Sequence, residues 1–399
     1  MTPLKVLVLS RSYPNRVLPY SGLWVEGLVR HAAGLCEPRV IAPVPYCPPL
    51  PGFVPYTRFR RIAPRERAKS IEVWHPRFLV GPGYSLHSFE ASTYYWGVQH
   101  RVEDLHREFP FDLIHAHFSY PDGVVAARLA RRYRVPALIT EHAPWLPWME
   151  DYPRVRHQAV WGFGECVFHI PVSRYVRNTI VHFTGESEKL RVIPVGVDGS
   201  IFAPPSDGRK PDVNQILYVG FINFTKGVDV LLRAMPRLVD RRPEVRLVLV
   251  GGSFYRHTRR QENRLRRMAQ ELRLDGHVEF VGMKPPHEVA AFMRESALLV
   301  LPSRAESFGA VLVEALACSI PIIATRSGGP EDILTEEVGV LVPSEDADAL
   351  AEAIEHVLEH RDTYEPARLR AYALEHYAWE RIARRTVDLY HQAVDRLRH

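Results

Sequence analysis

One stretch of the sequence combines residue types and spacing that could bind a phosphorylated sugar. In Ala297–Glu314 an apolar run leads into a short loop that presents Glu306, and a helix is predicted to begin near Ser307. Free backbone N–H groups at a helix start, with Gly309 allowing close approach, would cradle a phosphate. Glu314 lies eight residues beyond Glu306, roughly two helical turns, and its carboxylate could accept hydrogen bonds from paired sugar hydroxyls. Alternatively, Glu306 only caps the helix and Glu314 is a solvated surface charge.

A second strand–loop–helix stretch, Tyr218–Gly227, carries Lys226 on its loop. A lysine there could neutralise a diphosphate as a point charge, although it would equally suit a solvated loop before a glycine. The pairs Gly251-Gly252 and Gly328-Gly329 also follow apolar runs, but neither completes a GxGxxG motif. We interpret both pairs as turns.

Histidines and a glutamate end two further apolar runs, His115 and His117 in the first, Glu141 and His142 in the second. Four such groups at one sheet edge could bind a metal, act in acid–base or substrate-positioning roles, or simply be satisfied edge histidines. The sequence has no HExxH motif to favour the metal. The stretch Asp346–Asp348 resembles a metal-binding DxD, but its position predicts a helix start.

A parallel sheet is needed to position these groups. In the first half, apolar runs at 6–10, 113–117 and 137–140 predict buried strands, and 24–35 and 123–133 predict helices. Strands buried on both faces and separated by helices are typical of a doubly wound parallel sheet. Such sheets bind ligands beyond the carboxyl ends of their strands, which is where the polar residues above fall.

The second half repeats this plan after a linker-like stretch at 204–211. From residue 346 onward the pattern is helical to the end of the chain. The sequence therefore predicts an α/β protein with two Rossmann-like domains and a helical tail. The predicted strands are 215–219, 245–250, 277–281, 297–301, 321–324 and 339–342, and the predicted helices are 228–238, 260–272, 286–294 and 307–318.

Composition excludes several classes of protein. With 399 residues, 46% hydrophobic and 24% charged, the chain is neither disordered nor fibrous. Its four cysteines form no CxxC motif, so we expect neither a disulfide framework nor a zinc site. This cysteine usage favours a reducing compartment. Residues 1–198 carry 24 Lys and Arg against 17 Asp and Glu, whereas the remainder carries 27 against 29, which favours two domains with different partners. We find no targeting segment and no apolar run long enough to span a membrane, so we expect a cytoplasmic protein.

Taken together, the motifs resemble the large retaining glycosyltransferase family of the GT-B fold that carries an E-x7-E signature. Its bacterial members build cell-surface polysaccharides and glycolipids. The resemblance covers almost the whole chain, and the spacing of Glu306 and Glu314 is its most specific element. The other matching motifs are Ser12–Pro14, Ser21-Gly22, Asp112–His117, Thr140–His142, Lys226-Gly227, Gly328–Glu331, Gly339–Pro343 and Trp379-Glu380.

The resemblance implies a fold and a domain plan. Two Rossmann-like domains of the GT-B fold would face a cleft, with residues 1–198 binding the acceptor and residues 199–375 binding a nucleoside-diphosphate sugar. Residues 376–399 would form a C-terminal helix that packs back on the first domain. The implied reaction moves a hexosyl unit to a glycan or lipid-linked acceptor with retention, and it requires no metal ion or other cofactor because the nucleotide sugar is a substrate.

The resemblance also assigns roles to single residues. His142 would be the sugar-contacting catalytic histidine, Lys226 would stabilise charge on the departing diphosphate, and Glu306 would lie against the donor sugar. Glu314 would bind the ribose. The remaining donor-binding residues would be Gly22 and Gly220 near the phosphates, the main chain at Phe308, Gly309 and Ala310, and Met283 and Lys284 near the base.

Four positions depart from the family pattern. Phe221 stands where an arginine usually partners the lysine, and Ser21 replaces the first glycine of the N-terminal pair. Val195 replaces an asparagine and Ser319 a glycine. These differences concern the details of donor geometry more than the class of reaction.

The basic first half contains a segment that mixes arginines with aromatic residues, Phe53–Arg61 followed by Arg65, Arg67 and Lys69. It could contact an anionic membrane surface, giving a peripheral location at the inner face of the membrane, or it could be a solvated loop. No nucleic-acid recognition motif accompanies it, so nucleic acid is not expected as a partner.

Three other functions stay open to different degrees. A nucleotide-sugar epimerase or hydrolase of the same fold would use the donor without an acceptor. A catalytically silent sugar-binding relative would bind without turnover. The missing GxGxxG motif argues against a dinucleotide-dependent oxidoreductase.

Overall fold

The computed structural model describes residues 3–46, 48, 51–68, 71–81, 85–145, 148–206, 208, 211–252 and 256–398. The chain divides into two compact units. Unit 1 comprises Met1–Gly196 and Trp379–His399, and unit 2 comprises Val197–Ala378. From the sequence, the boundaries are predicted after residues 198 and 375.

Unit 1 is built on a seven-stranded sheet in the order β4-β5-β2-β1-β7-β8-β9. Neighbouring strands are parallel except for β4, which pairs antiparallel with β5 at one edge. A separate parallel pair joins β3 and β6. The strands are β1 Lys5–Leu9, β2 Glu37–Ile41, β3 Val44–Tyr46, β4 Arg65–Ala68, β5 Ile71–Trp74, β6 Arg77–Leu79, β7 Leu113–His117, β8 Ala137–Glu141 and β9 Phe168–Pro171.

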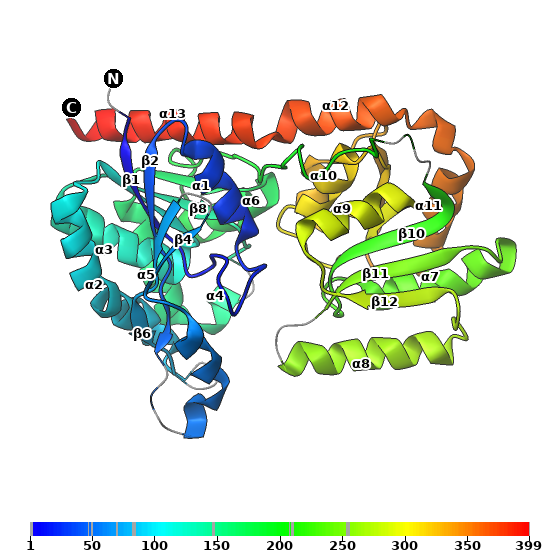
Figure 1. Cartoon of the computed structure of the whole chain (residues 1–399), viewed down its shortest axis with the longest axis horizontal. Helices are drawn as coiled ribbons and strands as arrows, with labels where there is room; N and C mark the ends of the chain where they lie inside the picture. Colours follow the sequence, from blue (N-terminus) through cyan, green and yellow to red (C-terminus); the bar gives the residue numbers. More distant parts are fainter. Residues whose placement is uncertain are drawn as a thin grey trace. The chain divides into compact units, whose positions relative to one another are not determined.

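Alternate side chains of the unit 1 strands enter two different hydrophobic cores. Val6 and Val8 of β1 belong to the core that contains α1 and α13, whereas Leu7 and Leu9 belong to the core that contains α2 and α3. Helices therefore cover both faces of the sheet (Figure 1). The helices and helical turns of unit 1 are α1 Leu23–Ala32, η1 Pro51–Arg61, η3 His87–Phe89, α2 Glu90–Glu108, η4 Ser119–Gly123, α3 Val124–Tyr133, α4 Trp148–Asp151, α5 Pro153–Glu165, α6 Arg174–Thr184 and α13 Trp379–Arg398.

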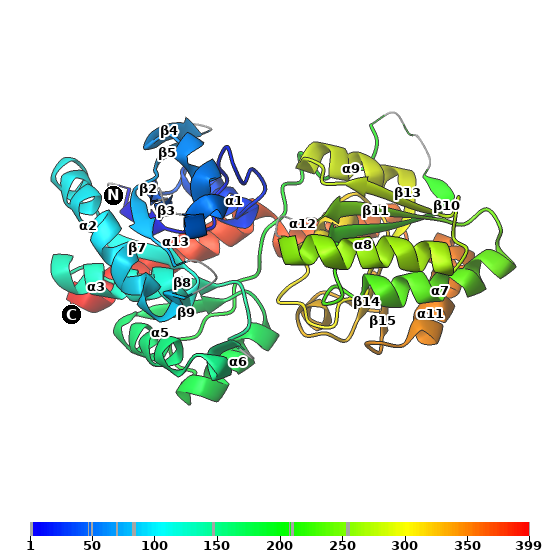
Figure 2. The same cartoon turned by 90° about the horizontal axis from the view of Figure 1, so that it is seen from below.

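Unit 2 has a fully parallel six-stranded sheet in the order β12-β11-β10-β13-β14-β15. Helix α7 contacts α8 and α11, whereas α10 contacts α9 and α12, so helices enclose this sheet from two sides (Figures 1 and 2). The strands are β10 Asp212–Phe221, β11 Arg246–Gly252, β12 Val278–Gly282, β13 Ser296–Leu301, β14 Ile322–Thr325 and β15 Gly339–Val342. The helices and helical turns are α7 Val228–Arg241, α8 Arg256–Glu271, α9 Pro286–Glu295, α10 Ala310–Ala317, η5 Gly329–Asp332, α11 Ala347–Glu359, η6 Arg361–Thr363 and α12 Pro366–Tyr377.

The two parallel sheets confirm the doubly wound architecture predicted for both halves of the chain. All six strands predicted in the second half are present, and Asp346 caps α11 by accepting a hydrogen bond from Ala349 N at 2.9 Å, as expected of a helix start. Several elements of unit 1 were missed. Strand β2 begins Glu37-Pro38-Arg39 and β4 reads Arg-Glu-Arg-Ala, so neither forms an apolar run that would reveal a strand.

The C-terminal helix α13 is an integral part of unit 1. Trp379, Ile382 and Tyr390 are buried in the same core as Val25 and Leu28 of α1. Removal of these apolar side chains from water stabilises the packing of α13 in this core, by about 25 cal/mol per Å² of apolar surface.

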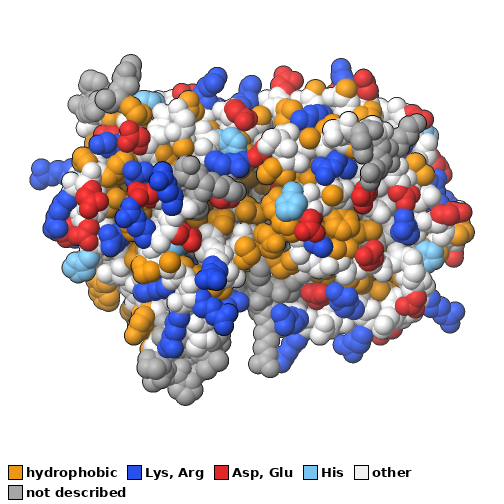
Figure 3. Space-filling model, in the orientation of Figure 1, with side chains coloured by type: hydrophobic (Ala, Val, Ile, Leu, Met, Phe, Trp, Pro, Cys, Tyr) orange, Lys and Arg blue, Asp and Glu red, His pale blue; other side chains and the backbone are white. Residues whose placement is uncertain are grey.

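The helices and the charged side chains at the surface bear on a possible contact with a membrane. Within the described residues, every helix falls short of the length or the apolar character that crossing a bilayer requires. On the face visible in Figure 3, Lys and Arg side chains of unit 1 lie among acidic and hydrophobic ones rather than in one continuous patch.

Candidate functional site

The order of strands in unit 2 reverses between β10 and β13, because β11 and β12 lie on one side of β10 and β13 to β15 on the other. Ligands of open parallel sheets bind at such a switch point, beyond the carboxyl ends of the strands. Lys226 lies on the loop that follows β10, and Glu306 on the loop that follows β13. The fold therefore brings together the loops that the sequence singles out.

Lys226 and Glu306 form an ion pair. Lys226 Nζ donates to Glu306 Oε2 at 2.6 Å, and Ser303 Oγ lies 3.4 Å from the same oxygen. The two side chains are 22% and 13% exposed, so the pair is partly buried but open on one side. The alternative that Lys226 is only a solvated charge is thereby wrong. The loop itself is shaped by Asn223, whose side-chain oxygen accepts a hydrogen bond from Lys226 N at 2.8 Å.

The backbone of Glu306 is held in an extended bridge, not in a helix. Glu306 N donates to Ser327 O at 3.0 Å, and Gly329 N donates to Glu306 O at 2.8 Å. Helix α10 consequently begins at Ala310 and not near Ser307 as predicted. Glu306 therefore does not cap the helix. It also does not lie two turns from Glu314 along one helix, since only Glu314 is on α10.

Gly309 occupies the N-cap position of α10 with φ +93°, a left-handed conformation that favours glycine. No side chain caps this helix in the part of the chain that the structure describes. The first N–H groups of α10 can thus bind an anion, which is the role predicted for the main chain at Gly309 and Ala310. Phe308 precedes them with a buried side chain, its ring 5.8 Å from that of Tyr377.

Glu314 lies in the second turn of α10, and its carboxyl has no hydrogen-bond partner among the described residues. Burial raises the pKa of this carboxyl to about 8, although the residue as a whole is only partly buried. This carboxyl is not the freely solvated surface charge of the alternative interpretation. A partly buried carboxyl without a partner is a candidate for pairing with ligand hydroxyls.

Three further predicted donor-binding residues follow neighbouring strands of the same sheet. Gly220 is the next-to-last residue of β10 and pairs with Gly251 of β11. Met283 follows β12, and a Cβ added to Gly252 would lie 3.1 Å from its Cγ. Lys284 pairs with Glu288 of α9 at 2.9 Å, so its charge is partly compensated at the surface.

The structure also reveals an arginine that sequence reasoning missed. Arg304 lies two residues before Glu306, and its Nη1 and Nη2 donate to the two carboxyl oxygens of Asp229 at 2.7 and 2.9 Å. Its Nε donates to Glu345 at 2.5 Å, and its backbone N donates to Thr225 O at 2.9 Å. Arg304 therefore ties the loop that carries Glu306 to the loop that carries Lys226.

The Asp229 carboxyl is adapted to this bidentate pair. Burial would raise its pKa, but hydrogen bonds and charge from Arg304 hold the pKa below its ordinary value. Asp229 lies three residues beyond Lys226 in the first turn of α7. The only sequence signal was an arginine and an aspartate close to two candidate residues, and nothing in the spacing indicated that they pair across 75 residues.

Two predicted site residues, His142 and Gly22, belong to unit 1. His142 follows β8, and its Nε2 shares a hydrogen bond with Nδ1 of His117 at 3.0 Å. Burial and the neighbouring His115 lower the pKa of His142 to about 3, so its imidazole is neutral. His142 lines a small, mainly apolar pocket together with Trp24 and Trp379.

Gly22 precedes α1 with φ +70°, and an added Cβ would lie 1.9 Å from Ser12 O. A side chain at this position would collide with the loop that follows β1. Close packing within unit 1 is therefore a sufficient reason for the glycine.

The other members of the histidine group have partners within unit 1. His115 contacts Tyr390 Oη at 2.7 Å and Thr140 Oγ1 at 2.8 Å. Glu141 accepts from Ser119 N at 2.8 Å and from Trp145 Nε1 at 3.0 Å. Within the described ranges, no group of three or more His, Cys, Asp or Glu side chains is placed to hold a metal ion. Both ring nitrogens of His115 therefore have partners, whereas Nε2 of His117 is buried without a hydrogen-bond partner among the described residues.

Comparison with known families assigns both halves of the chain. A family described as glycosyl transferases group 1 matches residues 202–376, and one described as glycosyltransferase family 4 matches residues 24–200. The D-inositol 3-phosphate glycosyltransferase of Paenarthrobacter aurescens is 30% identical over 329 residues, covering 74% of this chain and 76% of the relative.

Two further relatives extend the comparison. The GDP-mannose-dependent alpha-(1-6)-phosphatidylinositol monomannoside mannosyltransferase of Mycolicibacterium smegmatis is 33% identical over 238 residues, covering 55% of this chain and 60% of the relative. The crystal structure of Anabaena HepE in complex with UDP matches with a TM-score of 0.75 at 18% identity, covering 98% of this chain and all of the other, 100%. At that identity the likeness concerns the fold alone.

Proposed function

The chain belongs to the group 1 glycosyltransferases and has their GT-B fold, and on that premise we propose that it transfers a hexosyl unit from a nucleoside-diphosphate sugar with retention at the anomeric carbon. The acceptor is a glycan or glycolipid, and the reaction belongs to the biosynthesis of cell-surface polysaccharides or glycolipids. Two relatives support this choice, since one is a D-inositol 3-phosphate glycosyltransferase and the other is a GDP-mannose-dependent phosphatidylinositol monomannoside mannosyltransferase.

The observation that carries the proposal is the Lys226–Glu306 pair at the switch point of the unit 2 sheet. When the bond between the sugar and the diphosphate breaks, negative charge grows on the leaving phosphate. An ammonium held at that point stabilises the charge, and such preorganised groups contribute strongly to catalysis. Glu306 orients Lys226 in the free protein and lies against the donor sugar in the complex.

The remaining donor contacts follow from the start of α10 and from the partly buried Glu314 carboxyl on that helix. The free N–H groups at Gly309 and Ala310 bind the phosphates, as helix N-termini do. Glu314 accepts hydrogen bonds from the ribose hydroxyls and finds there the partner that it lacks within the described chain. Phe308, Gly220 and Gly22 shape the phosphate region, and Met283 and Lys284 contact the base.

His142 acts as a neutral hydrogen-bonding group toward the donor sugar. Its lowered pKa supports this role, because a neutral imidazole can both donate and accept while it adds no charge beside the developing anion. His117 fixes the ring through the hydrogen bond between the two imidazoles.

We further propose that the reaction needs no metal ion, with Lys226 supplying the positive charge. Turnover measured with excess EDTA should then equal turnover with magnesium. A loss of activity in EDTA that returns with a divalent cation would refute this part of the proposal.

A peripheral location at the inner face of the membrane is proposed for the same enzyme. Arg60, Arg61, Arg65 and Arg67 are exposed, although Arg65 pairs with Glu72. Lys69 and the side chain of Phe53 lie outside the described residues. Flotation with anionic vesicles at low and high salt tests this location, and absence of binding at low salt would contradict it.

A thermal-shift screen against UDP, GDP, ADP and their sugar conjugates tests the central proposal. A ligand at one hundred times its Kd stabilises the folded state by about 2.7 kcal/mol. We expect one nucleotide to raise the melting temperature of the wild type, and Glu314→Gln to abolish the shift. No shift with any nucleotide would refute the proposal. Release of free sugar that no acceptor accelerates would indicate the hydrolase alternative.

A further inference from the structure

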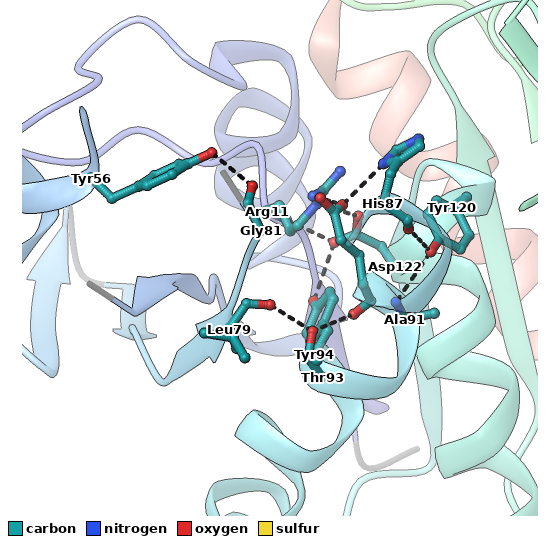
Figure 4. A network of polar contacts seen from close by, with 11 residues as sticks. Arg11, Tyr56, Leu79, Gly81, His87, Ala91, Thr93, Tyr94, Tyr120 and Asp122 are labelled. Carbon is teal, nitrogen blue, oxygen red and sulfur yellow. Dashed lines mark hydrogen bonds and ion pairs between the residues drawn. The ribbon is translucent and has the colours of Figure 1, made fainter. Parts of the chain in front are cut away.

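A cluster of charged and aromatic side chains at the carboxyl end of the unit 1 sheet has no role in the donor contacts above. Strand order in unit 1 reverses between β1 and β7, so this edge is the switch point of the first sheet. Arg11 follows β1 by two residues and reaches Glu90 at the start of α2 and Asp122 in η4. Figure 4 shows Arg11, Asp122, His87 and Tyr120 converging at this place.

The Arg11 side chain is held before any ligand arrives. Its Nη1 donates to Glu90 Oε2 at 2.9 Å, and its backbone N donates to Asp122 Oδ1 at 2.7 Å. Tyr94 Oη donates to the same Asp122 oxygen at 3.2 Å. The carboxylate side chains are only 4% and 1% exposed, so they form a rigid base beneath the guanidinium. A preorganised group loses little entropy when it binds a ligand.

These contacts nevertheless leave one donor group of the Arg11 guanidinium available. Its side chain is 33% exposed, and in the part of the chain that the structure describes Nη2 has no hydrogen-bond partner. If Arg11 served only to join three loops, its donors would all be expected to face the carboxylates. Nη2 is therefore left as a fixed donor for a ligand at the sheet edge.

Aromatic rings stand beside the guanidinium. Nδ1 of His87 lies 3.5 Å from the Glu90 oxygen that binds Arg11. The His87 ring makes edge contacts with the rings of Tyr120 at 5.5 Å and Tyr152 at 5.1 Å. Tyr152 is 40% exposed, so part of this aromatic wall is accessible. Small-molecule sites typically combine such apolar walls with a few fixed polar groups.

The charges of the cluster argue against an anionic ligand. One guanidinium faces two carboxylates. Burial would raise the pKa of Glu90, but the hydrogen bond from His87 and the charge of Arg11 lower it, so Glu90 is ionised at neutral pH. Burial raises the pKa of Asp122 to about 7 despite Arg11. The positive charge of Arg11 is already neutralised, and a phosphate dianion would meet an excess of negative charge.

We propose that Arg11, His87 and Tyr152 bind an uncharged polyol ring of the acceptor, a sugar or cyclitol that carries no phosphate on that ring. Arg11 Nη2 donates to ring hydroxyl oxygens, and the C–H surface of the ring packs against His87 and Tyr152. This inference rests on the proposed function, because only a transferase has an acceptor. It separates this chain from its relative, the D-inositol 3-phosphate glycosyltransferase of Paenarthrobacter aurescens.

Saturation-transfer NMR on the full chain, in the presence of the nucleoside diphosphate that stabilises it most, provides the test. The probes are methyl α-mannoside, methyl α-glucoside and myo-inositol, each compared with its monophosphate. We expect at least one neutral probe to bind, with its phosphate about tenfold weaker, since 1.4 kcal/mol of repulsion corresponds to that ratio. Tighter binding of the phosphates, or binding of none of the probes while the nucleotide binds, would overturn the inference.

Two variants locate the binding. Arg11→Lys keeps a positive charge beside Glu90 but loses the planar fork, and we expect about tenfold weaker binding of the neutral probe. Tyr152→Ala changes a partly exposed residue without disturbing buried carboxylates, so it remains informative if Arg11→Lys fails to fold, and we expect about threefold weakening. Lys189→Ala, which removes a lysine that donates to the exposed Gly164 carbonyl of unit 1, is the matched control and should leave polyol binding intact. If both site variants bind normally, the inference is wrong, whereas absence of nucleotide binding would refute the proposed function instead.

Discussion

The carboxyl edges of the two sheets have the same topology but opposite chemistry. In unit 2 the switch point presents a partly exposed cation, Lys226, and a carboxyl without a partner, Glu314. In unit 1 the corresponding edge holds neutral imidazoles and one arginine, Arg11, whose charge two carboxylates compensate. Unit 2 is thus suited to an anion, and unit 1 to hydroxyl groups.

Burial accounts for the neutral imidazoles of unit 1. The side chains of His115 and His117 are fully enclosed, and desolvation lowers their pKa values far enough to keep them neutral. The two cations differ in their partners, because Lys226 faces one carboxylate, Glu306, whereas Arg11 faces Glu90 and Asp122. Strand order alone therefore locates a site in both units, but the charges gathered there decide what each one binds.

The strongest test of the comparison removes the unit 2 cation. Lys226→Ala should lower kcat by about 10²–10³-fold, the effect of losing one electrostatic stabiliser of a developing anion. Steady-state kinetics of the wild type and the variant provide the measurement. Lys189→Ala, which removes a lysine that donates to the exposed Gly164 carbonyl of unit 1, is the matched control. Full activity of Lys226→Ala would mean that unit 2 does not use its cation.

The next test separates positioning from direct contact. Arg304→Ala should lower kcat by about 10–10²-fold with little change in donor KM, because displaced reacting groups cost that much. It should also reduce the free energy of unfolding by roughly 1–3 kcal/mol, since Asp229 is left without its bidentate partner. Arg304→Lys should restore part of the activity.

Arg237→Ala is the control for Arg304. Arg237 pairs with Glu352 and Glu355 on the surface of unit 2, and such pairs contribute less than about 1 kcal/mol. An equal loss of activity in both variants would show that the Arg304 pair has no special relation to the Lys226 and Glu306 loops.

Acid should destabilise unit 1. His115, His142 and His169 have pKa values of about 3 in the folded protein, below the ordinary value of 6.5. Between these values the unfolded chain binds more protons, so the stabilising contribution is present above pH 6.5 and is lost as the pH falls toward 3. Each histidine contributes at most about 1.4 kcal/mol per pH unit.

Tryptophan fluorescence isolates this effect, since all seven tryptophans lie in unit 1. Urea unfolding between pH 7 and pH 5 should show a decreasing midpoint. His115→Gln should flatten that dependence, whereas substitution of the exposed His100 by Gln should not. A midpoint independent of pH would show that the buried histidines are not neutral.

Raising the pH should destabilise unit 2, and this effect should be smaller than the loss of stability of unit 1 in acid. Because the pKa of Glu314 is about 8 when folded, its protonated form stabilises unit 2 below the ordinary value of 4.5, and this contribution is lost as the pH rises through 8. Nucleotide affinity should increase over the same range, by at most about tenfold per pH unit, because the ionised carboxylate accepts stronger hydrogen bonds from ribose.

Calorimetric titrations of the protein with nucleotide at pH 6 to 9 test the expected increase in affinity. Glu314→Gln should abolish the increase in affinity, and substitution of the exposed Glu359 by Gln should leave it intact. The same pH dependence in Glu314→Gln would assign the titration to another group.

Local sequence patterns were sufficient for much of unit 2. Most strands of unit 2 contain a continuous apolar run, such as Leu247–Val250 in β11 and Ala297–Leu301 in β13, and the glycines and polar residues after these runs mark loops. The strands of unit 1 were harder to predict from the sequence, because β2 and β4 contain charged residues and β9 contains His169 and Pro171. Tertiary pairing stabilises these strands where local propensity does not.

The sequence by itself determined the alternation of strands and helices, the likeness to a glycosyltransferase family, and the identity of Lys226, Glu306, Glu314 and His142 as candidates. Only the tertiary structure decided their state. Whether Lys226 meets Glu306, whether α10 starts at residue 307 or 310, and which way each pKa moves all depend on groups far apart in the sequence. Burial and long-range pairing are properties of the folded chain, and no local pattern of residues encodes them.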